Sequence, residues 1–228
     1  FDALKPELIQ LVKAIAPKVE STNDQVLHRN FDEDKQWQFG LAVINRFGLD
    51  FTRARQDKSV HPFTTSFSIN DVRLTTRVSR DFISPALFGT LHETGHALYE
   101  LGGHQAYDRT PLAGGASLGM HESQSRMWEN LVGRSRPFWK YFFPLLKNSF
   151  PDQLADQTPE SFYRAASAVK PSFIRVEADE VTYGLHIMLR FEIENEILER
   201  KIKLSDVPEA WNAKMQESLG LTPPTTAD

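Results

Sequence analysis

The spacing of hydrophobic residues predicts a mainly helical chain. Leu, Val and Ile recur every three or four positions over residues 4–20, and a second stretch of this kind covers 34–48. The same spacing, together with proline and glycine near the ends, predicts further helices over 85–101, 121–135, 159–169, 171–203 and 208–219. The predicted helix over 171–203 is long and charged and contains few helix-breaking residues.

One part of the chain has a different pattern. Residues 63–69 and 72–78 are rich in β-branched residues, and Asn70-Asp71 between them favours a tight turn. This pattern predicts a β-hairpin over 63–78, directly before the helix at 85–101. The predicted fold class is therefore mainly α, with one small antiparallel β-hairpin beside that helix.

Composition narrows the possible classes of function. Hydrophobic residues make up 40% of the 228 positions, which is enough to bury a sizeable core. The formal net charge of -4 lacks the basic excess typical of nucleic-acid binding. No apolar run approaches the ~20 residues that cross a bilayer. With 0 Cys, disulfides and thiolate metal sites are excluded. We expect a cytoplasmic protein with neither nucleic acid nor membrane as a partner.

The most specific motif is His92-Glu93-Thr94-Gly95-His96, within the helix predicted at 85–101. Residues four apart lie on one helix face, so His92 and His96 can direct two imidazoles at one cation. Glu93 lies about 100° further round the helix, within reach of a water on that cation. This is the His-Glu-x-x-His arrangement of zinc peptidases. The alternative is two surface histidines that flank an ordinary glutamate.

A zinc site of this kind needs a third protein ligand and one open position. Glu122, near the start of the helix predicted at 121–135, is the candidate, because the preceding loop is long enough to bring that helix back. His121 competes with it for the same role. A glutamate at a helix N-terminus can also simply complement the helix dipole.

Two other segments contain polar residues whose roles cannot be decided from the sequence pattern alone. Asp71 and Arg73 can be a turn cap and a solvated strand charge. A set of polar residues recurs every three or four positions along the helix predicted at 171–203, on one face. They form either a solvated face or a buried polar seam, and they are Arg175, Asp179, Tyr183, His186 and Arg190.

Five segments, taken in order, resemble the carboxypeptidase Taq family of zinc metallocarboxypeptidases. They are His61-Pro62-Phe63, Asp71-Val72-Arg73-Leu74-Thr75, His92-Glu93-Thr94-Gly95-His96, His121-Glu122-Ser123-Gln124 and Ile174-Arg175-Val176-Glu177-Ala178-Asp179-Glu180. The resemblance implies a helical, zincin-like peptidase with a cleft, which removes single residues from the C-termini of peptides. It also implies a role for each matching residue. These are zinc ligands at His92, His96 and Glu122, a general base at Glu93, a receptor for the substrate carboxylate at Arg175, and cleft-lining residues at Arg73 and His61.

Members of the family are longer and carry a further motif, Gly-x-x-Gln-Asp-x-His-Trp, beyond the region that this chain covers. We therefore expect residues 1–228 to be a single helical catalytic core from a longer peptidase, and the resemblance implies that this peptidase is a homodimer. Two alternatives stay open. One is a zinc endopeptidase or oligopeptidase with the same core. The other is an inactive helical fragment or scaffold with a vestigial metal site.

Overall fold

The chain divides into two compact units in a computed structural model, which describes residues 1–19 and 23–225. One unit is Asp24–Ala166, and the other joins Phe1–Asn23 to Ser167–Asp228. The expectation of one catalytic core over 1–228 stays a prediction, because two such units can belong to one functional domain.

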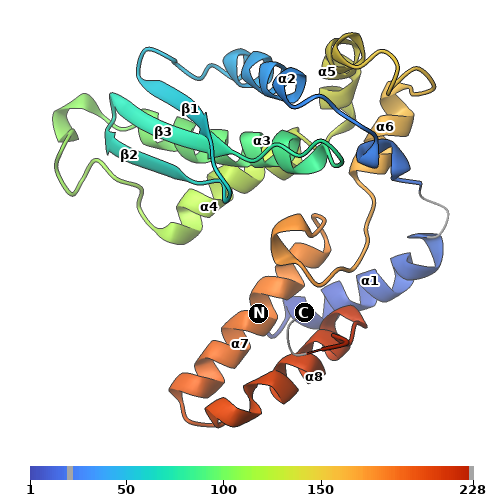
Figure 1. Ribbon diagram of the computed structural model, residues 1–228. Helices are drawn as coiled ribbons and strands as arrows, with labels where there is room; N and C mark the ends of the chain where they lie inside the picture. Colours follow the sequence, from blue (N-terminus) through green and yellow to red (C-terminus); the bar gives the residue numbers. More distant parts are fainter. Residues whose placement is uncertain (20–22, 226–228) are drawn as a thin grey trace. The chain divides into compact units, whose positions relative to one another are not determined.

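The unit Asp24–Ala166 contains a small sheet that lies against α3 (Ser84–Leu101), together with further helices (Figure 1). Its α-helices and strands are α2 (Glu33–Arg46), β1 (Ala54–Lys58), β2 (Thr64–Ser68), β3 (Asp71–Thr76), α3 (Ser84–Leu101), α4 (Leu118–Arg126), α5 (Arg136–Ser149) and α6 (Pro159–Ala166). A π-helical segment, Met127–Val132, continues α4. Short 3-10 turns occupy Gln25–His28 and Gln105–Tyr107.

The second unit is entirely helical in its described residues. It contains α1 (Leu4–Val19), α7 (Thr182–Leu198) and α8 (Val207–Leu219), with 3-10 turns at Arg175–Glu177 and Leu204–Asp206. Its core joins one residue of α1 to the apolar faces of α7 and α8. The buried members are Val12, Leu185, Met188, Leu189, Ile193, Met215 and Leu219. The mainly helical fold class with a small sheet is confirmed.

The predicted hairpin is present as β2 and β3, which pair antiparallel with Thr64 opposite Leu74. The sheet is nevertheless mixed, because β1 pairs parallel with β3 on its other side and gives the order β1-β3-β2. The antiparallel hairpin was therefore expected, whereas the parallel strand β1 was not. The sequence of β1, Ala-Arg-Gln-Asp-Lys, buries only Ala54 and Gln56 and lacks the β-branched residues that reveal a strand.

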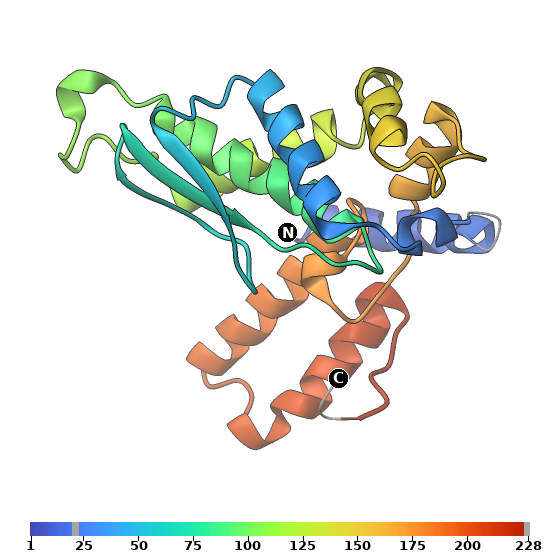
Figure 2. The same cartoon turned by 45° about the horizontal axis from the view of Figure 1, so that its top comes forward.

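Helix α3 is the central element of its unit. On one side it packs against β3, where Val72, Leu74, Ala97 and Leu101 share a cluster of buried residues. On the other side Leu87, Phe88 and Leu91 join a larger, aromatic-rich core with α2 and α5. Figures 1 and 2 both show that the strands lie beside α3. They also show that α4 runs next to α3. Because α3 is enclosed in this way, its position is well determined by packing.

The helix predicted over 171–203 is wrong at its start, since α7 begins at Thr182. The carboxylate of Asp179 accepts hydrogen bonds from the backbone N–H groups of Val181 and Thr182 and from the hydroxyl of Thr182. It thereby satisfies donors of the first helical turn and fixes the beginning of α7. Of the expected polar stripe, Arg175 and Asp179 precede the helix, although Arg175 still donates to the hydroxyl of Tyr183 at 2.9 Å.

The helix predicted over 121–135 begins three residues earlier, at Leu118. The hydroxyl of Ser117 accepts from the backbone N–H of Met120 at 3.1 Å and caps it.

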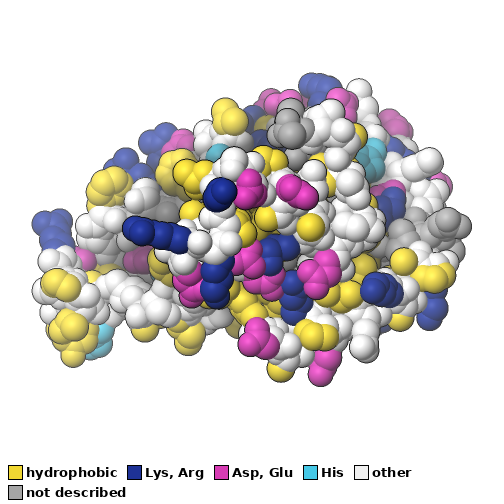
Figure 3. Space-filling model, turned by 90° about the horizontal axis from the view of Figure 1, so that it is seen from below, with side chains coloured by type: hydrophobic (Ala, Val, Ile, Leu, Met, Phe, Trp, Pro, Cys, Tyr) yellow, Lys and Arg dark blue, Asp and Glu magenta, His cyan; other side chains and the backbone are white. Residues whose placement is uncertain are grey.

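None of the helices in the described residues combines the length and hydropathy that a membrane span requires. On the face drawn in Figure 3, basic and acidic side chains are interspersed rather than separated.

Candidate metal centre

Three predicted ligand residues converge between α3 and α4. His92 and His96 lie one turn apart on α3, and Glu122 lies on α4. Oε2 of Glu122 is 3.6 Å from Nε2 of His92 and 3.4 Å from Nε2 of His96. One ligand atom from each residue lies within 4.8 Å of the other two. The structure therefore brings His92, His96 and Glu122 together.

The distances suit a single small cation. Tetrahedral ligands at about 2.0–2.2 Å from one ion stand about 3.3–3.6 Å from one another. The two distances from Glu122 to the imidazole nitrogens fall at this spacing. Two imidazoles and one carboxylate are also the donor set of a catalytic zinc site with one open position. The residues present fit such an ion.

The close approach of the two helices depends on Gly95, which stands between the two histidines. A Cβ atom there would lie 2.6 Å from the backbone oxygen of Gln124 and 2.6 Å from Cα of Ser125. No flexible side chain could move to relieve these contacts. The glycine in the motif therefore lets the backbone of α4 contact α3, which brings Glu122 within reach of the histidines.

A buried carboxylate orients the first histidine. Nδ1 of His92 lies 2.8 Å from Oε2 of Glu129, which is 8% exposed and belongs to the π-helical segment. Because a carboxylate accepts, Nδ1 donates its proton to Glu129, and Nε2 is the atom that faces Glu122 and is placed to bind an ion. Arg126 donates to both acids, to Oε1 of Glu122 at 3.1 Å and to Oε2 of Glu129 at 2.8 Å. Sequence reasoning did not identify Glu129 or Arg126 as part of the site.

These charges shift the pKa values of the site. Burial raises the pKa of Glu122, but the hydrogen bond with His96 and the charges of His92 and Arg126 outweigh it, and the pKa falls to about 2. Burial likewise opposes ionisation of Glu129, yet His92, Arg126 and Arg134 lower its pKa. Burial alone would lower the pKa of His92, while Glu129 and Glu122 raise it. Both carboxylates are therefore ionised at neutral pH.

The second histidine also has a partner behind it. Nδ1 of His96 lies 2.6 Å from Nδ1 of His121, and Nε2 of His121 lies 2.6 Å from Oε1 of Glu100. His121 was the competitor for the third ligand position. It stands beside His96, with both of its nitrogens engaged, and is not grouped with the three converging residues.

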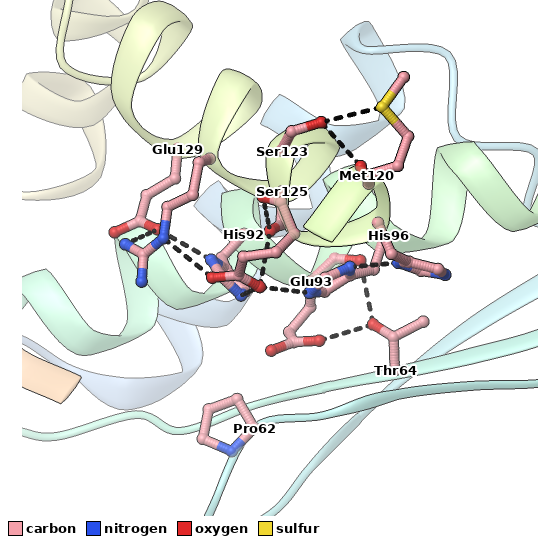
Figure 4. A network of polar contacts seen from close by, with 12 residues as sticks. Pro62, Thr64, His92, Glu93, His96, Met120, Ser123, Ser125 and Glu129 are labelled. Atoms are coloured by element: carbon pink, nitrogen blue, oxygen red, sulfur yellow. Dashed lines mark hydrogen bonds and ion pairs between the residues drawn. The ribbon is translucent and has the colours of Figure 1, made fainter. Parts of the chain in front are cut away.

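Glu93 is 6% exposed and is held by the sheet. The hydroxyl of Thr64 on β2 donates to Oε2 of Glu93 at 2.7 Å. Figure 4 shows the carboxylate of Glu93 turned toward Thr64 and Pro62, away from the side on which Glu129 contacts His92. The carboxylate therefore has a fixed orientation beside the two histidines.

Arg73 and His61 make their contacts outside this cluster. The exposed guanidinium of Arg73 pairs with Asp71 through Nε at 2.9 Å and Nη2 at 3.0 Å. His61 is exposed, and its Nδ1 lies 2.8 Å from the backbone oxygen of Pro62. Arg175 belongs to the second unit. The roles assigned to Arg73, His61 and Arg175 stay predictions.

The sequence matches the family model "Carboxypeptidase Taq (M32) metallopeptidase" over residues 1–228. It is 42% identical over 228 residues to "Carboxypeptidase 1" of Bacillus subtilis, across 100% of this chain and 46% of that protein. It is 44% identical over 223 residues to "Thermostable carboxypeptidase 1" of Thermus thermophilus, across 98% of this chain and 44% of that protein.

Solved structures of carboxypeptidases also resemble this chain along nearly its whole length. The crystal structure of an M32 carboxypeptidase from Deinococcus radiodurans matches with a TM-score of 0.92 and 46% identity, over 98% of this chain and 46% of that one. A Pyrococcus furiosus carboxypeptidase matches with a TM-score of 0.93 and 41% identity, over 100% of this chain and 47% of that one. The chain thus spans somewhat less than half the length of these relatives.

Proposed function

Because the chain belongs to the carboxypeptidase Taq (M32) metallopeptidase family, we propose that it carries the metal centre of a zinc-dependent metallocarboxypeptidase. The substrate is a peptide with a free C-terminus, and the product is its last amino acid. The observation that carries this proposal is the convergence of His92, His96 and Glu122 at the spacing of tetrahedral ligands, next to Glu93.

Each of these residues has a separate role in the proposed hydrolysis of the peptide bond. His92, His96 and Glu122 would hold the ion, which would supply a Lewis acid to polarise the substrate carbonyl and acidify a water molecule. Glu93 accepts a proton from that water as it attacks the carbonyl carbon. As the peptide bond breaks, Glu93 gives the proton to the departing amine. The hydrogen bond from Thr64 keeps the carboxylate of Glu93 in one orientation through both transfers.

Exopeptidase specificity requires a group that binds the free carboxylate of the substrate. Arg175 is assigned to this task, because a planar guanidinium can bind a carboxylate with two parallel hydrogen bonds. The partner that the structure shows for its Nη1 is the hydroxyl of Tyr183, at 2.9 Å, and not a carboxylate. Its charge is therefore available to a substrate.

The first test measures metal content. The chain, purified with zinc and dialysed, should retain one zinc ion per molecule, and His96→Ala should lose it because two ligands do not hold the ion. Glu93→Gln should retain it, since Glu93 is not a ligand. Zinc content that is unchanged in His96→Ala contradicts the assignment of the ligands.

The second test measures turnover of a peptide with a free C-terminus. Because this chain spans about half of its relatives, turnover is measured in the chain and in the Thermus thermophilus relative carrying this chain in place of its matching segment. Cleavage should release single C-terminal residues, and Glu93→Gln should lower kcat by about 10²–10⁴-fold. Internal cleavage would indicate an endopeptidase, and absence of cleavage in both proteins would indicate a vestigial site. Either result overturns the proposal.

A further inference from the structure

Three side chains behind His96 form a continuous array that none of the predicted roles uses. Oε2 of Glu100 accepts from the hydroxyl of Ser66 at 2.8 Å, and its Oε1 lies 2.6 Å from Nε2 of His121. Nδ1 of His121 in turn lies 2.6 Å from Nδ1 of His96. The array runs from β2 through α3 and α4 and ends at the ring whose Nε2 faces Glu122.

The polar groups fix the direction of each hydrogen bond. The carboxylate of Glu100 can only accept, so Nε2 of His121 carries a proton and donates it. In a neutral His121 the other nitrogen, Nδ1, is then an acceptor. The short contact between the two histidines therefore requires that Nδ1 of His96 donates. A neutral His96 with its proton on Nδ1 has a free lone pair on Nε2, the atom that faces Glu122.

Packing holds His121 in the orientation that this array needs. The ring of Tyr99 meets that of His121 edge-on, with centroids 5.1 Å apart and planes at 82°. On another side is Gly115, where a Cβ atom would lie 2.9 Å from Cδ2 of His121 and 2.8 Å from Cε1 of Tyr99. A larger residue at 115 would displace one of the two rings. The ring of His121 is thus confined, and its nitrogens cannot readily exchange partners.

We propose that Glu100 and His121 are positioning residues that hold His96 in the tautomer able to bind the metal through Nε2. This rests on the proposed function, because it takes the cation between His92, His96 and Glu122 as given. The two histidines of the motif then reach the same state by different routes. Glu129 sets the tautomer of His92 directly, whereas Glu100 sets that of His96 through a second imidazole. Partners of this kind typically contribute about 10–100-fold to metal affinity.

The test compares zinc affinity among variants by competition with a chelator of known affinity. His121→Phe keeps a ring but removes the acceptor for His96, and should weaken zinc binding by about 10–100-fold. His121→Gln keeps an amide oxygen to accept from His96 and an amide N–H to donate to Glu100, and should recover most of the loss. His28→Phe is the matched control, because His28 is exposed and stacks on Phe82 at 4.3 Å, so affinity should not change.

A spectroscopic measurement on the unsubstituted chain tests the same proposal without any variant. Long-range ¹H–¹⁵N NMR of the zinc-loaded chain should show the proton of His96 on Nδ1 and that of His121 on Nε2. The opposite tautomer of His96, equal zinc affinity in His121→Phe and the unsubstituted chain, or a His121→Gln variant as weak as His121→Phe each overturns the inference. Failure of the unsubstituted chain to bind zinc would instead contradict the proposed function, and the two failures are therefore distinguishable.

Discussion

The hydroxyl of Thr64 on β2 donates a 2.7 Å hydrogen bond to the carboxylate of Glu93 on α3. Two residues further along the strand, the hydroxyl of Ser66 donates to Glu100 at 2.8 Å. Alternate residues of a strand point to the same side, and residues seven apart on a helix lie on one face two turns apart. One short strand therefore orients two acidic side chains of α3. Glu93 is held by Thr64, and Glu100, held by Ser66, contacts His121.

Removal of the Thr64 hydroxyl should slow turnover without loss of metal. Thr64→Val keeps the shape of the side chain but leaves Glu93 without its donor. We expect kcat to fall roughly 10–150-fold, in line with the about 1.5–3 kcal/mol of a hydrogen bond to a charged group. The measurements are kcat in the chimeric Thermus thermophilus protein and zinc content of the chain. Thr65→Val, at the neighbouring position of the same strand, is the control, and an equal loss there would refute a specific role for Thr64.

Gly95 should not tolerate even one methyl group. Gly95→Ala would place Cβ 2.6 Å from the backbone of α4, and should destabilise the fold by about 1–3 kcal/mol while weakening zinc binding. Gly89, on the same helix, is the control, because a Cβ there would meet only Cγ of Pro62 at 3.8 Å. Gly89→Ala should be neutral or stabilising, by up to about 1 kcal/mol, since alanine favours helix. Urea unfolding compares them, and equal stability of the two variants would contradict the close-approach argument.

Local periodicity accounts for the three side chains that converge in the structure. His92 and His96 follow from a four-residue spacing on one helix, and Glu122 from a loop that returns to it. The partners behind them were missed, although Glu100 lies four residues after His96 and therefore on the same face. The sequence does not reveal which residues of α3 contact which residues of the helical segment that packs against it. That choice depends on the contact at Gly95 and on the π-helical segment that carries Glu129.

The fold was predicted least well where local signals were misleading. No element was expected over 136–149, yet α5 runs through Pro144, with five large side chains buried along it. They are Phe138, Trp139, Phe142, Phe143 and Leu146. The free energy gained by burying these side chains exceeds the cost of the backbone hydrogen bond that proline removes. Conversely, the helical spacing from Pro171 onward was not sufficient for helix, because Asp179 caps α7 from outside.

Arg175 should determine the preference for free C-termini. Arg175→Ala should lower kcat/KM for a peptide with a free carboxylate by 100-fold or more, roughly 3 kcal/mol for a buried charge-assisted pair, and leave an amidated peptide nearly unaffected. For Arg175→Lys, kcat/KM for the same peptide should lie between the values of Arg175→Ala and the unsubstituted protein, because an ammonium cannot bind both oxygens in parallel. Tyr183→Phe, which removes only the hydroxyl contacted by Arg175, should have a smaller effect. Equal losses on both peptides would remove Arg175 from carboxylate recognition.

His186 should make the protein less stable in mild acid. Its side chain is 0% exposed, and within residues 1–19 and 23–225 neither ring nitrogen has a hydrogen-bond partner at normal geometry, so it resists protonation. Burial and then the charge of Arg190 lower its pKa to about 4. A smaller contribution of Arg175 acts in the same direction, and the backbone of Ser172 and the charge of Asp179 oppose them without offsetting burial.

The sign of the effect follows from this lowered pKa. Below about pH 6.5 the unfolded chain binds a proton that folded His186 does not take up until about pH 4, so stability is lost as the pH falls through this range. Between pH 7.5 and pH 5 the loss from this group is about 2 kcal/mol. His186→Phe removes the titrating group and fills similar space. Its stability relative to the unsubstituted chain, measured by urea unfolding, should therefore rise by about that amount over the same interval. A difference between the two proteins that stays constant with pH would mean that His186 titrates alike in the folded and unfolded states.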